Sequence, residues 1–383
     1  MPYEFYIIFF IAITVFIGFL FTFPRYSEQD DADMLQKYLK IKEDLLSVMT
    51  FNIRLDGFER NPNNHFTKRI YRLIETIEKW QPVILCLQEP LTKQLQQWQS
   101  HLPKYYQSIG YQRGCIDECE KDFQVAILYD NQKLKLIDRD YIWLSKTPRI
   151  VGSKDWESNK ARTLNIARFE LISSNNSTNV LVFNTHLDVK SELARREQAK
   201  IIRSTINQWQ KKYPTDIVLL FGDFNTIPQQ MTYRILTSEN FLYDTWTMCK
   251  SHLSECISNS FSSTFHGWLG SIANTYGFQI IQGILYTFRG IGIDVPYSLS
   301  MHFSFYVNLV RELIEHRRMI KFPEIKSLWS SHRFHVDWIL YQNSIDGNIE
   351  LQPRFVSVID IRSRNYSSDH FPLVAAFQIK KDD

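Results

Sequence analysis

Residues 218–225 read VLLFGDFN, an apolar run that stops at two polar side chains, Asp223 and Asn225. Residues 181–187 read LVFNTHL and repeat the pattern, because this run also stops at a reactive group, His186. A short apolar run bounded by polar residues is typical of a buried strand. Each run therefore predicts a strand whose C-terminal end carries a side chain that is able to do chemistry.

Further apolar runs along the chain have polar residues of the same kinds beside them. They are SVMTFN at 47–52 with Asn52, ILCLQE at 84–89 with Glu89, HVDWIL at 335–340 with Asp337, and the last strand, which follows SDH at 368–370 with Asp369 and His370. Sites in open sheets lie outside the strand ends, so these residues could converge. A single one of them is commonly a turn former or a cap, but the ordered series favours a common site.

Apolar runs and helical patterns alternate along the chain. The apolar residues of 70–80 recur at helical spacing before Pro82, and a second helix is predicted over about 191–213, before Pro214. Strands are predicted at 46–53, 83–87, 125–129, 180–183, 217–221, 336–341 and 373–377. This alternation predicts a layered α/β architecture in which helices cover the sheet faces.

The polar residues at the strand ends suit phosphoester chemistry. Glu89, Asp223 and Asp369 offer hard oxygen ligands of the kind that Mg²⁺ or Mn²⁺ prefers. The imidazoles of His186 and His370 supply the charge stabilisation and proton transfer that phosphoester hydrolysis needs. No zinc site is predicted, because the cysteines have no histidine close to them in sequence. The sequence also lacks a Gly-rich phosphate loop.

The Asn, Gln-Glu, Thr-His-Leu, Gly-Asp-Phe-Asn, Val-Asp-Trp-Ile and Ser-Asp-His elements occur in a characteristic order. Over roughly residues 46–380 the chain thereby resembles the endonuclease/exonuclease/phosphatase superfamily of metal-dependent phosphoesterases. The resemblance implies a four-layer α/β sandwich of two packed mixed sheets flanked by helices, with a divalent metal between the sheet edges. It also implies that Glu89 binds this metal with the help of Asn52 and Asp369.

The resemblance implies roles in catalysis as well. Asp223 with Asn225 would orient the water and the scissile phosphate. Asp337 would hold His370, which acts as a base or as an electrostatic partner. His186 would act opposite His370, on the leaving group or on a phosphate oxygen. Which group takes the proton of the water stays open from the sequence.

Four further stretches resemble the uncharacterised, deadenylase-like branch of the superfamily: NIRLD at 52–56, ART at 161–163, HLD at 186–188 and TFHG at 264–267. In these stretches Arg54, Arg162 and His266 are candidate substrate contacts, since a guanidinium fork matches phosphate oxygens. Each could instead belong to a surface ion pair. The inositol 5-phosphatase signatures are missing, and the abasic-endonuclease pattern would place Asn rather than His at position 186.

Composition sets broad limits. The 383 residues are 44% hydrophobic and 22% charged, which is typical of a globular protein and not of a disordered one. The net charge of +3 is too small to indicate an obligate duplex-DNA binder, which usually carries a large excess of positive charge. Five cysteines are too few for a disulfide scaffold. Cys115 with Cys119 and Cys249 with Cys256 are candidate local disulfides, and Cys86 is predicted to be a buried thiol.

Residues 5–23 carry no charge, and a helix of this length reaches about 28 Å, close to the thickness of the bilayer hydrocarbon. The segment predicts an uncleaved transmembrane anchor, because its flanks are unlike those of a signal peptide. Basic residues after the span favour a cytosolic domain. The sequons at Asn175, Asn176 and Asn365 and the cysteine pairs favour a lumenal or extracellular domain, and this is the orientation that we expect of a single-pass membrane protein.

We therefore expect four segments: a transmembrane anchor at 1–23, a stalk at 24–45, a catalytic domain at 46–380 and, within it, an insertion at about 276–330. The expected activity is that of a membrane-anchored, Mg²⁺-dependent phosphodiesterase of the nuclease type, either a 3'-5' RNA exonuclease or endonuclease-like. Expected partners are nucleic acid and, through the N-terminal helix, a lipid bilayer, with no obligate protein partner. The alternatives are a phospholipid or phosphoinositide hydrolase and an inactive, membrane-tethered binding module.

Overall fold

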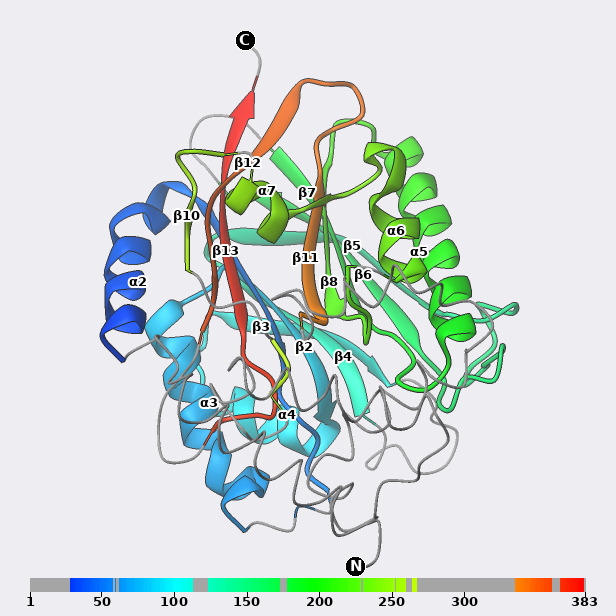
Figure 1. Ribbon diagram of the computed structural model, residues 1–383, viewed down its shortest axis with the longest axis horizontal. Coiled ribbons are helices and arrows are strands. Elements are labelled where there is room, and N and C mark those ends of the chain that lie inside the picture. Colours follow the sequence, from blue (N-terminus) through cyan, green and yellow to red (C-terminus); the bar gives the residue numbers. More distant parts are fainter. Residues whose placement is uncertain are drawn as a thin grey trace, which may run out of the picture.

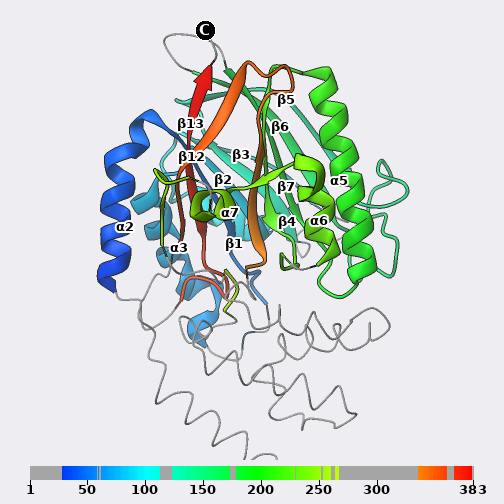
Figure 2. The same ribbon diagram turned by 45° about the horizontal axis from the view of Figure 1, so that its top comes forward.

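Two mixed β-sheets pack face to face, and helices cover the outer face of each (Figures 1 and 2). The computed structural model describes residues 28–57, 59, 62–112, 123–172, 178–228, 230–251, 253–259, 264–266, 335–359 and 366–381. The predicted α/β class, with two packed mixed sheets flanked by helices, is confirmed. The insertion predicted at 276–330 lies outside the described residues.

The first sheet has seven strands in the order β10-β12-β13-β1-β2-β4-β3. Their bounds are β1 Leu46–Asn52, β2 Ile84–Leu91, β3 Tyr106–Gln112, β4 Phe123–Asp130, β10 Ile257–Ser258, β12 Ile349–Val358 and β13 Leu373–Lys381. Strand β1 lies parallel to β2 and antiparallel to β13. Because β1 and β2 run in the same direction, their C-terminal residues meet at one edge of the sheet.

The second sheet has six strands in the order β5-β6-β7-β8-β11-β9. Their bounds are β5 Leu134–Trp143, β6 Thr163–Leu171, β7 Thr178–His186, β8 Ile217–Asp223, β9 Tyr243–Asp244 and β11 Asp337–Gln342. Strands β7 and β8 are parallel, and β11 is antiparallel to β8. The end of β7, the end of β8 and the start of β11 therefore lie side by side.

The core between the sheets is built by the alternation of side chains along the central strands. Val48 of β1 points into the core between the sheets, and its neighbour Met49 points into the core under the helices. In β7, Val182 faces the other sheet and Phe183 faces the helices. Because both faces of these strands are covered, their sequences are continuous apolar runs and do not alternate with polar residues.

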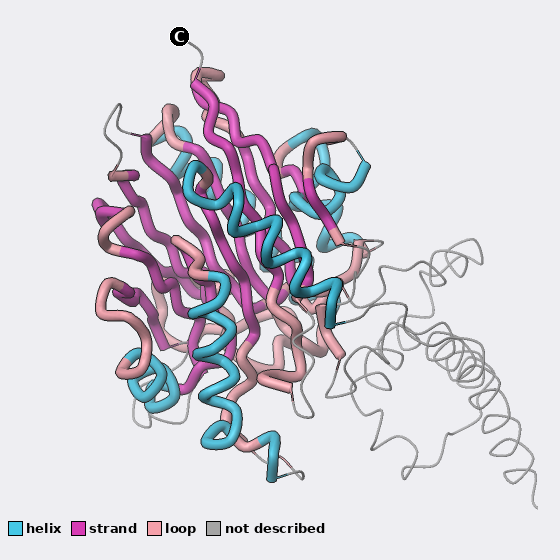
Figure 3. The backbone as a smooth tube through the Cα atoms, turned by 90° about the vertical axis from the view of Figure 1, so that its left-hand side faces the viewer, coloured by secondary structure: helices cyan, strands magenta, loops and turns pink. Residues whose placement is uncertain are grey.

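Helices α3 (Phe66–Trp80) and α4 (Thr92–Gln99) cover the first sheet, and Figure 3 shows helices crossing in front of its strands. Helix α3 buries the face predicted from its sequence, including Ile70 and Trp80. It ends where Gln81 adopts a left-handed conformation, with φ of 45°, and Pro82 follows. Both features stop a helix, so the predicted end of α3 is confirmed.

The region predicted as a stalk is a helix packed on the domain, which corrects that part of the sequence interpretation. Helix α2 (Glu28–Ile41) lies against α3 (Figure 2), and the short 3-10 helix η1 (Lys42–Asp44) leads from it into β1. The Tyr38 side chain is fully buried, and its hydroxyl donates to the backbone oxygen of Trp80 over 2.8 Å. Met34 and Tyr38 lie one helical turn apart, so they form an apolar face within a polar sequence.

Helix α5 (Glu192–Lys212) covers the second sheet together with α6 (Met231–Thr237). The Ser191 side chain caps α5 by accepting a hydrogen bond from the Ala194 N–H, and Tyr213 ends it, as the sequence predicted. Helix α7 (Thr245–Ser251) contacts β11 and β12. The remaining short helices are η2 (Pro62–Asn64) and η4 (Ser238–Asn240).

Several strands were not predicted from the sequence. In β5 charged residues alternate with apolar ones, and one face is exposed, so no continuous apolar run marks it. In β12 the pairing with β13 shifts register between Pro353 and Phe355. Proline cannot donate to the ladder, and in a sequence it usually argues against a strand. The local pattern therefore hides β12, although tertiary pairing holds it in the sheet.

The predicted membrane localisation is corrected by the structure. The predicted anchor, residues 5–23, lies outside the described residues. Among the helices that the structure does describe, none has both the length and the apolar character needed to cross a membrane. The expectation of a single-pass membrane protein with a lumenal or extracellular domain is therefore withdrawn, and so is that of a lipid bilayer as partner.

The predicted states of three cysteines are confirmed. Cys249 on α7 forms a disulfide with Cys256, and Cys86 on β2 is a buried free thiol. Cys115, Cys119 and the predicted sequons lie outside the described residues.

Candidate active site

Three strand ends of the second sheet bring their polar residues together. His186 at the end of β7 pairs in register with Asp223 at the end of β8, and Asp337 at the start of β11 pairs with Asp223 from the other side. Gly222 allows this approach, since a Cβ atom at that position would lie 2.3 Å from the backbone oxygen of Thr185. The glycine of the GDFN stretch therefore permits close packing of β7 against β8.

The first sheet contributes Asn52 and Glu89 to the same place. The Asn52 Nδ2 group donates to Asp223 Oδ2 at 3.0 Å and to Glu89 Oε1 at 3.3 Å, so it links the two sheets. Glu89 has a φ of 68°, in the left-handed region, and its other oxygen accepts from the Leu55 N–H at 3.1 Å. This conformation turns the Glu89 carboxylate out of the strand direction and fixes it over the sheet edge.

His370 and Asp337 form a buried pair. The Nδ1 atom of His370 lies 2.9 Å from Asp337 Oδ2, and its Nε2 atom lies 3.7 Å from Asp223 Oδ2. Burial lowers the pKa of His370, but the carboxylates of Asp337 and Asp223 raise it more strongly, so that it rises to about 10. These neighbours favour the protonated ring, whose Nε2 atom faces Asp223. The Thr264 hydroxyl accepts the backbone N–H of Asp337 over 3.0 Å and fixes the start of β11.

His186 lies on the other side of Asp223. Its Nε2 atom lies 3.0 Å from Asn225 Nδ2 and 3.5 Å from Asp223 Oδ2. Asn225 has a φ of 47°, and its backbone N–H donates to Asp223 Oδ1 over 2.9 Å. The left-handed turn after β8 thus brings the Asn225 amide back onto the carboxylate that ends the strand. Asp223 is flanked by both imidazoles.

Negative charge is concentrated at this edge. Burial raises the pKa of Asp223 to about 7, and the neighbouring Asp337 carboxylate raises it in the same direction. The Oδ1 atom of Asp337 is buried and has no hydrogen-bond partner among the described residues. A bound cation would offset the negative charge of Asp223 and Asp337 and would give the Asp337 Oδ1 atom a partner. The chemistry of the donors is that of carboxylate oxygens, which suit a hard divalent cation.

One set of these donors is grouped closely enough to hold such a cation. One atom from each of Asp223, Asp337 and His370 lies within 4.8 Å of the others, although His370 Nδ1 is already bonded to Asp337. The set expected from the sequence is Glu89 and Asp369 with Asn52. Asn52 donates through Nδ2 to the carboxylates of Glu89 and Asp223, and its Oδ1 atom accepts from the Arg54 N–H at 3.0 Å. In this structure Asn52 therefore connects the acidic residues.

Arg54 and Asp369 close the site on the side of the first sheet. The guanidinium of Arg54 lies 3.7 Å from Asp369 Oδ2, and its Nε donates to Glu59 over 2.8 Å. Burial raises the pKa of Asp369, but Arg54 and His370 outweigh it, and the net pKa falls below its usual value. The Arg54 side chain is 36% exposed. Of the three predicted substrate contacts it is therefore the one that solvent reaches.

Arg162 and His266 are buried. Arg162 is 3% exposed and its Nε lies 3.9 Å from Asp188 Oδ2, two residues after His186 in sequence. The ring of His266 is stacked on Phe371 with 4.0 Å between centroids, and burial lowers its pKa to about 3. The His266 ring is thus neutral and packed beneath the SDH segment. The backbone N–H of His266 donates to the backbone oxygen of Asp369 over 2.9 Å.

Sequence reasoning missed Arg69, a buried residue that holds backbone segments next to the site in place. Its buried guanidinium donates to four backbone oxygens in three parts of the chain: those of Ile53 and Arg54, of Asn64, and of Ser367. Two of these parts carry site residues, since one follows Asn52 and the other precedes Asp369. A sequence signal existed, because Arg69 lies on the apolar face of α3 between Phe66 and Ile70, where a cation needs buried partners.

Comparison with known proteins places this geometry in context. A model of the Endonuclease/Exonuclease/phosphatase family matches residues 49–370, which include every strand-end residue described above. A protein of Saccharomyces cerevisiae described as a probable RNA exonuclease, NGL3, is 29% identical over 217 residues. That match covers 52% of this chain and 41% of the yeast protein, so the chain spans less than half the length of this relative.

Solved structures with the same fold include a mannosyl-6-phosphatase of Bacteroides thetaiotaomicron, with a TM-score of 0.61 and 19% identity over 87% of this chain and 99% of that one. They also include TDP2 of D. rerio in complex with a single strand DNA product. For TDP2 the TM-score is 0.54 and the identity 16%, over 87% of this chain and 98% of that one. At these identities the likeness concerns the fold alone.

Proposed function

The chain belongs to the endonuclease/exonuclease/phosphatase family, as an enzyme that acts on phosphate ester bonds, and we propose that its substrate is the phosphodiester of a nucleic acid, RNA before DNA. The observation that carries the proposal is the meeting of six side chains in one network across both sheets: Asn52, Glu89, His186, Asp223, Asp337 and His370. Asn52 joins Glu89 to Asp223, and Asp223 lies between His186 and His370.

Asp223, His370 and His186 each have a separate role in the proposed reaction. Asp223 Oδ2 is the acceptor placed to orient a water molecule, with the Asn225 N–H holding the other carboxylate oxygen. His370 is protonated between two carboxylates and donates from Nε2, so it stabilises negative charge on a phosphate oxygen. His186 lies across Asp223 and serves the leaving oxygen. The water oxygen attacks phosphorus as the bond to that oxygen breaks, which yields a phosphate monoester and an alcohol.

A divalent cation is part of the proposal. Glu89 and Asp369 would hold it, with Asn52 between Glu89 and Asp223, and Mg²⁺ or Mn²⁺ matches their oxygen donors. When bound, the ion neutralises charge on the phosphate oxygens. Arg54, which contacts Asp369 and reaches solvent, is placed to bind a second phosphate oxygen.

Two likenesses support nucleic acid as the substrate. The yeast relative is described as a probable RNA exonuclease. The fold itself accommodates a nucleic-acid strand, since the TDP2 structure was solved with a single strand DNA product. The mannosyl-6-phosphatase has the same fold, so a sugar phosphate monoester is the substrate class against which the proposal must be tested.

The test offers the full chain a labelled single-stranded RNA, a single-stranded DNA, mannose 6-phosphate, sphingomyelin and inositol phosphates, each with Mg²⁺, with Mn²⁺ and with EDTA. We expect RNA to be cut with a free metal ion and not in EDTA. Asp223→Asn should lower the rate by a factor of about 10³ or more, the size of effect seen for key charge-stabilising groups. The matched control is Asp138→Asn, a surface carboxylate paired with Lys212, which should cut at the wild-type rate.

The other results would contradict the proposal. Hydrolysis of mannose 6-phosphate without cleavage of RNA or DNA would identify a phosphomonoesterase. Selective hydrolysis of sphingomyelin would identify a lipid phosphodiesterase. Cleavage of RNA in EDTA at the full rate would remove the metal from the account and leave the substrate class standing.

A further inference from the structure

A loop beside the proposed site carries lysines and a tryptophan that the catalytic account does not use. It comprises residues 144–162, between β5 and β6. We call Lys146, Lys154, Trp156 and Lys160, together with the nearby Lys190, the Trp156 surface. All four lysines are exposed and Trp156 is half-buried.

The register of the second sheet places this loop close to His186. Leu164 of β6 pairs with Thr185 of β7, so Thr163 lies beside His186, and the Thr185 hydroxyl donates to the Thr163 oxygen over 2.9 Å. Trp143, the last residue of β5, pairs with Thr163. Because neighbouring strands are about 4.8 Å apart, both ends of the loop begin within about 10 Å of His186.

The loop is fixed to the segment that follows His186. Asp188 is fully buried, and its Oδ2 atom accepts the Ser158 hydroxyl and the Asn159 N–H, each over 2.9 Å. The Ser191 hydroxyl donates to the backbone oxygen of Trp156 over 3.0 Å. Trp156 has a φ of 53°, a left-handed conformation that these bonds on both sides hold in place. The backbone at Trp156 is therefore held by bonds within the protein.

The charge of the Trp156 surface is not neutralised by its own neighbours. In the described structure none of its four lysines lies within ion-pair distance of a carboxylate. Arg149 on the same loop differs, since both of its terminal nitrogens contact Asp140 at 2.7 Å. The Lys146 ammonium lies 6.0 Å from the centre of the Trp156 ring. The loop also carries two carboxylates, the half-buried Asp155 and the exposed Glu157, so four lysines face two acidic side chains and the net charge is positive.

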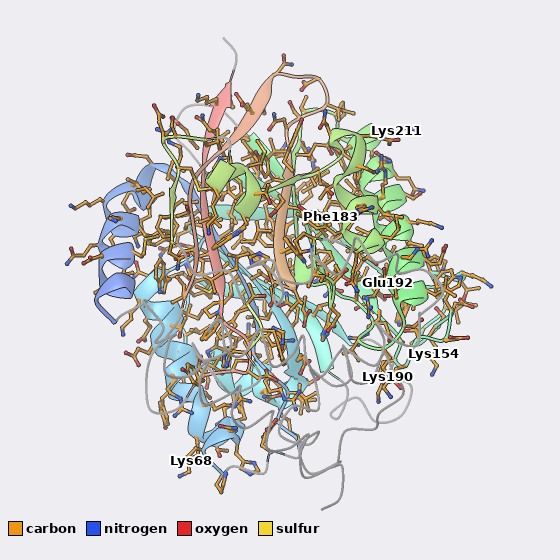
Figure 4. All side chains as sticks on the ribbon, viewed as in Figure 1. Lys68, Lys154, Phe183, Lys190, Glu192 and Lys211 are labelled. Atoms are coloured by element: carbon orange, nitrogen blue, oxygen red, sulfur yellow. A yellow bond between two sulfur atoms is a disulfide. The ribbon has the colours of Figure 1, made fainter. Side chains whose placement is uncertain are left out.

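Figure 4 shows the arrangement on the ribbon. Lys154 and Lys190 lie near one another beside Glu192, at the N-terminal end of α5, whereas Lys211 lies at the opposite end of that helix. The bond between Ser191 and Trp156 confirms that the two segments are neighbours. Two neighbouring segments thus contribute the lysines of the Trp156 surface, and the loop that carries Trp156 begins beside the strand that ends at His186.

We propose that the Trp156 surface holds the part of a single-stranded nucleic acid that extends from the scissile phosphate past His186. One base stacks on the Trp156 indole, and Lys154 and Lys190 contact the phosphates beside it. Stacking on an aromatic ring with lysines along the backbone is how single strands are bound without sequence preference. The proposal rests on the nuclease function proposed above, and it adds where the strand lies.

The test measures binding separately from cleavage. The full chain is titrated in EDTA into a short fluorescein-labelled single-stranded RNA, and anisotropy is followed. Trp156→Ala should weaken binding about five- to 150-fold, the range for loss of one stacked base. Trp156→Phe keeps a stacking face and should retain most of the affinity. Lys154→Gln with Lys190→Gln should reduce the salt slope by about 1.4, since each phosphate contact on a single strand contributes about 0.7.

Matched controls lie elsewhere on the surface. Tyr71→Ala removes an aromatic side chain that is 68% exposed on α3, and Lys37→Gln with Lys211→Gln removes two exposed lysines from α2 and the far end of α5. All controls should bind RNA as the wild type does. Thermal unfolding of Trp156→Ala beside Trp156→Phe shows whether the loop has been disrupted, because loss of folding would lower the midpoint of Trp156→Ala alone.

The outcomes separate the two proposals. If Trp156→Ala and the lysine pair bind RNA as tightly as the controls, or if the wild type does not bind RNA, the Trp156 surface is overturned. If the variants lose affinity as expected but the wild type cuts no RNA with Mg²⁺, the surface stands and the nuclease function fails. If RNA is cut and Trp156→Phe binds as poorly as Trp156→Ala while both stay folded, stacking is overturned.

Discussion

Gly222 sets how closely β8 approaches β7, and Asp223 follows it directly. Gly222→Ala would place a Cβ atom 2.3 Å from the Thr185 oxygen, which is backbone and cannot move alone. We expect a loss of about 1–3 kcal/mol in the free energy of unfolding, as for overpacking, together with a lower kcat. Gly347→Ala is the control, because Gly347 also has a positive φ but has open space around it. An equal effect of the two substitutions on kcat would contradict this account.

Asp188 should make stability depend on pH. Burial raises its pKa, but Arg162 and the N–H groups of Ser191 and Lys190 lower it more, so the folded state has the lower pKa. The unfolded chain then binds the proton more readily, and the stabilisation is complete above the unfolded pKa of about 3.9 and is lost as the pH falls through the folded value.

The check is urea unfolding of the wild type and of Asp188→Asn between pH 7 and pH 3. The variant should be less stable by about 3–5 kcal/mol at pH 7, the cost of breaking a buried ion pair, and the difference should shrink on acidification. A difference that stays constant over this range would show that Asp188 is not charged in the folded protein.

How far the sequence predicts the site differs between residues. Asn52 and Glu89 lie at or near the ends of one parallel pair of strands, and His186 and Asp223 end another, so the sequence predicts that each pair meets at one edge of its sheet. The bond between Asn52 Nδ2 and Asp223 Oδ2 joins residues 171 apart, and no local pattern encodes it. His266 shows the reverse, because its motif suggested a substrate contact and the fold buries it under the SDH segment.

Helix α2 shows how a polar sequence can hide a packing element. Only Met34 and Tyr38 are buried in its described side chains, so its pattern resembles a stalk. Tyr38→Ala should cost about 3–5 kcal/mol of unfolding free energy, the range for truncating a buried aromatic. Leu39→Ala, at a side chain that is 44% exposed, should change it by less than about 0.5 kcal/mol. Similar values for the two in chemical denaturation would mean that α2 does not pack on the domain in solution.

Helix α3 acts on the site through Arg69, which holds the segments after β1 and before β13. Arg69→Lys keeps the charge but cannot reproduce the planar set of donors that reach four backbone oxygens. We expect kcat to fall at least about tenfold, because Asp369 and His370 follow Ser367 and a misplaced catalytic group costs that much or more. Lys79→Arg is the control for kcat, because Lys79 is exposed on the same helix and pairs with Glu75. Equal rates for the Arg69 and Lys79 variants would refute a positioning role of Arg69.

The sequence predicts the layered architecture better than it predicts the number of strands. Continuous apolar runs mark the strands that are covered on both faces, such as β1, β7 and β8. Strands with one exposed face, such as β5, carry alternating charges, and β12 contains Pro353. These strands exist because the neighbouring strands supply hydrogen-bond partners, which is tertiary information. The convergence of the strand-end residues is predictable because it depends on the central strands.

In the proposed reaction a water molecule held by Asp223 attacks phosphorus. Cleavage of single-stranded RNA in ¹⁸O-labelled water with Mg²⁺, followed by mass spectrometry of the products, tests this attack directly. We predict one ¹⁸O atom in the newly formed phosphate end, none in the released hydroxyl end, and no such product from Asp223→Asn. Label in the hydroxyl product, or an unlabelled cyclic phosphate, would contradict the account.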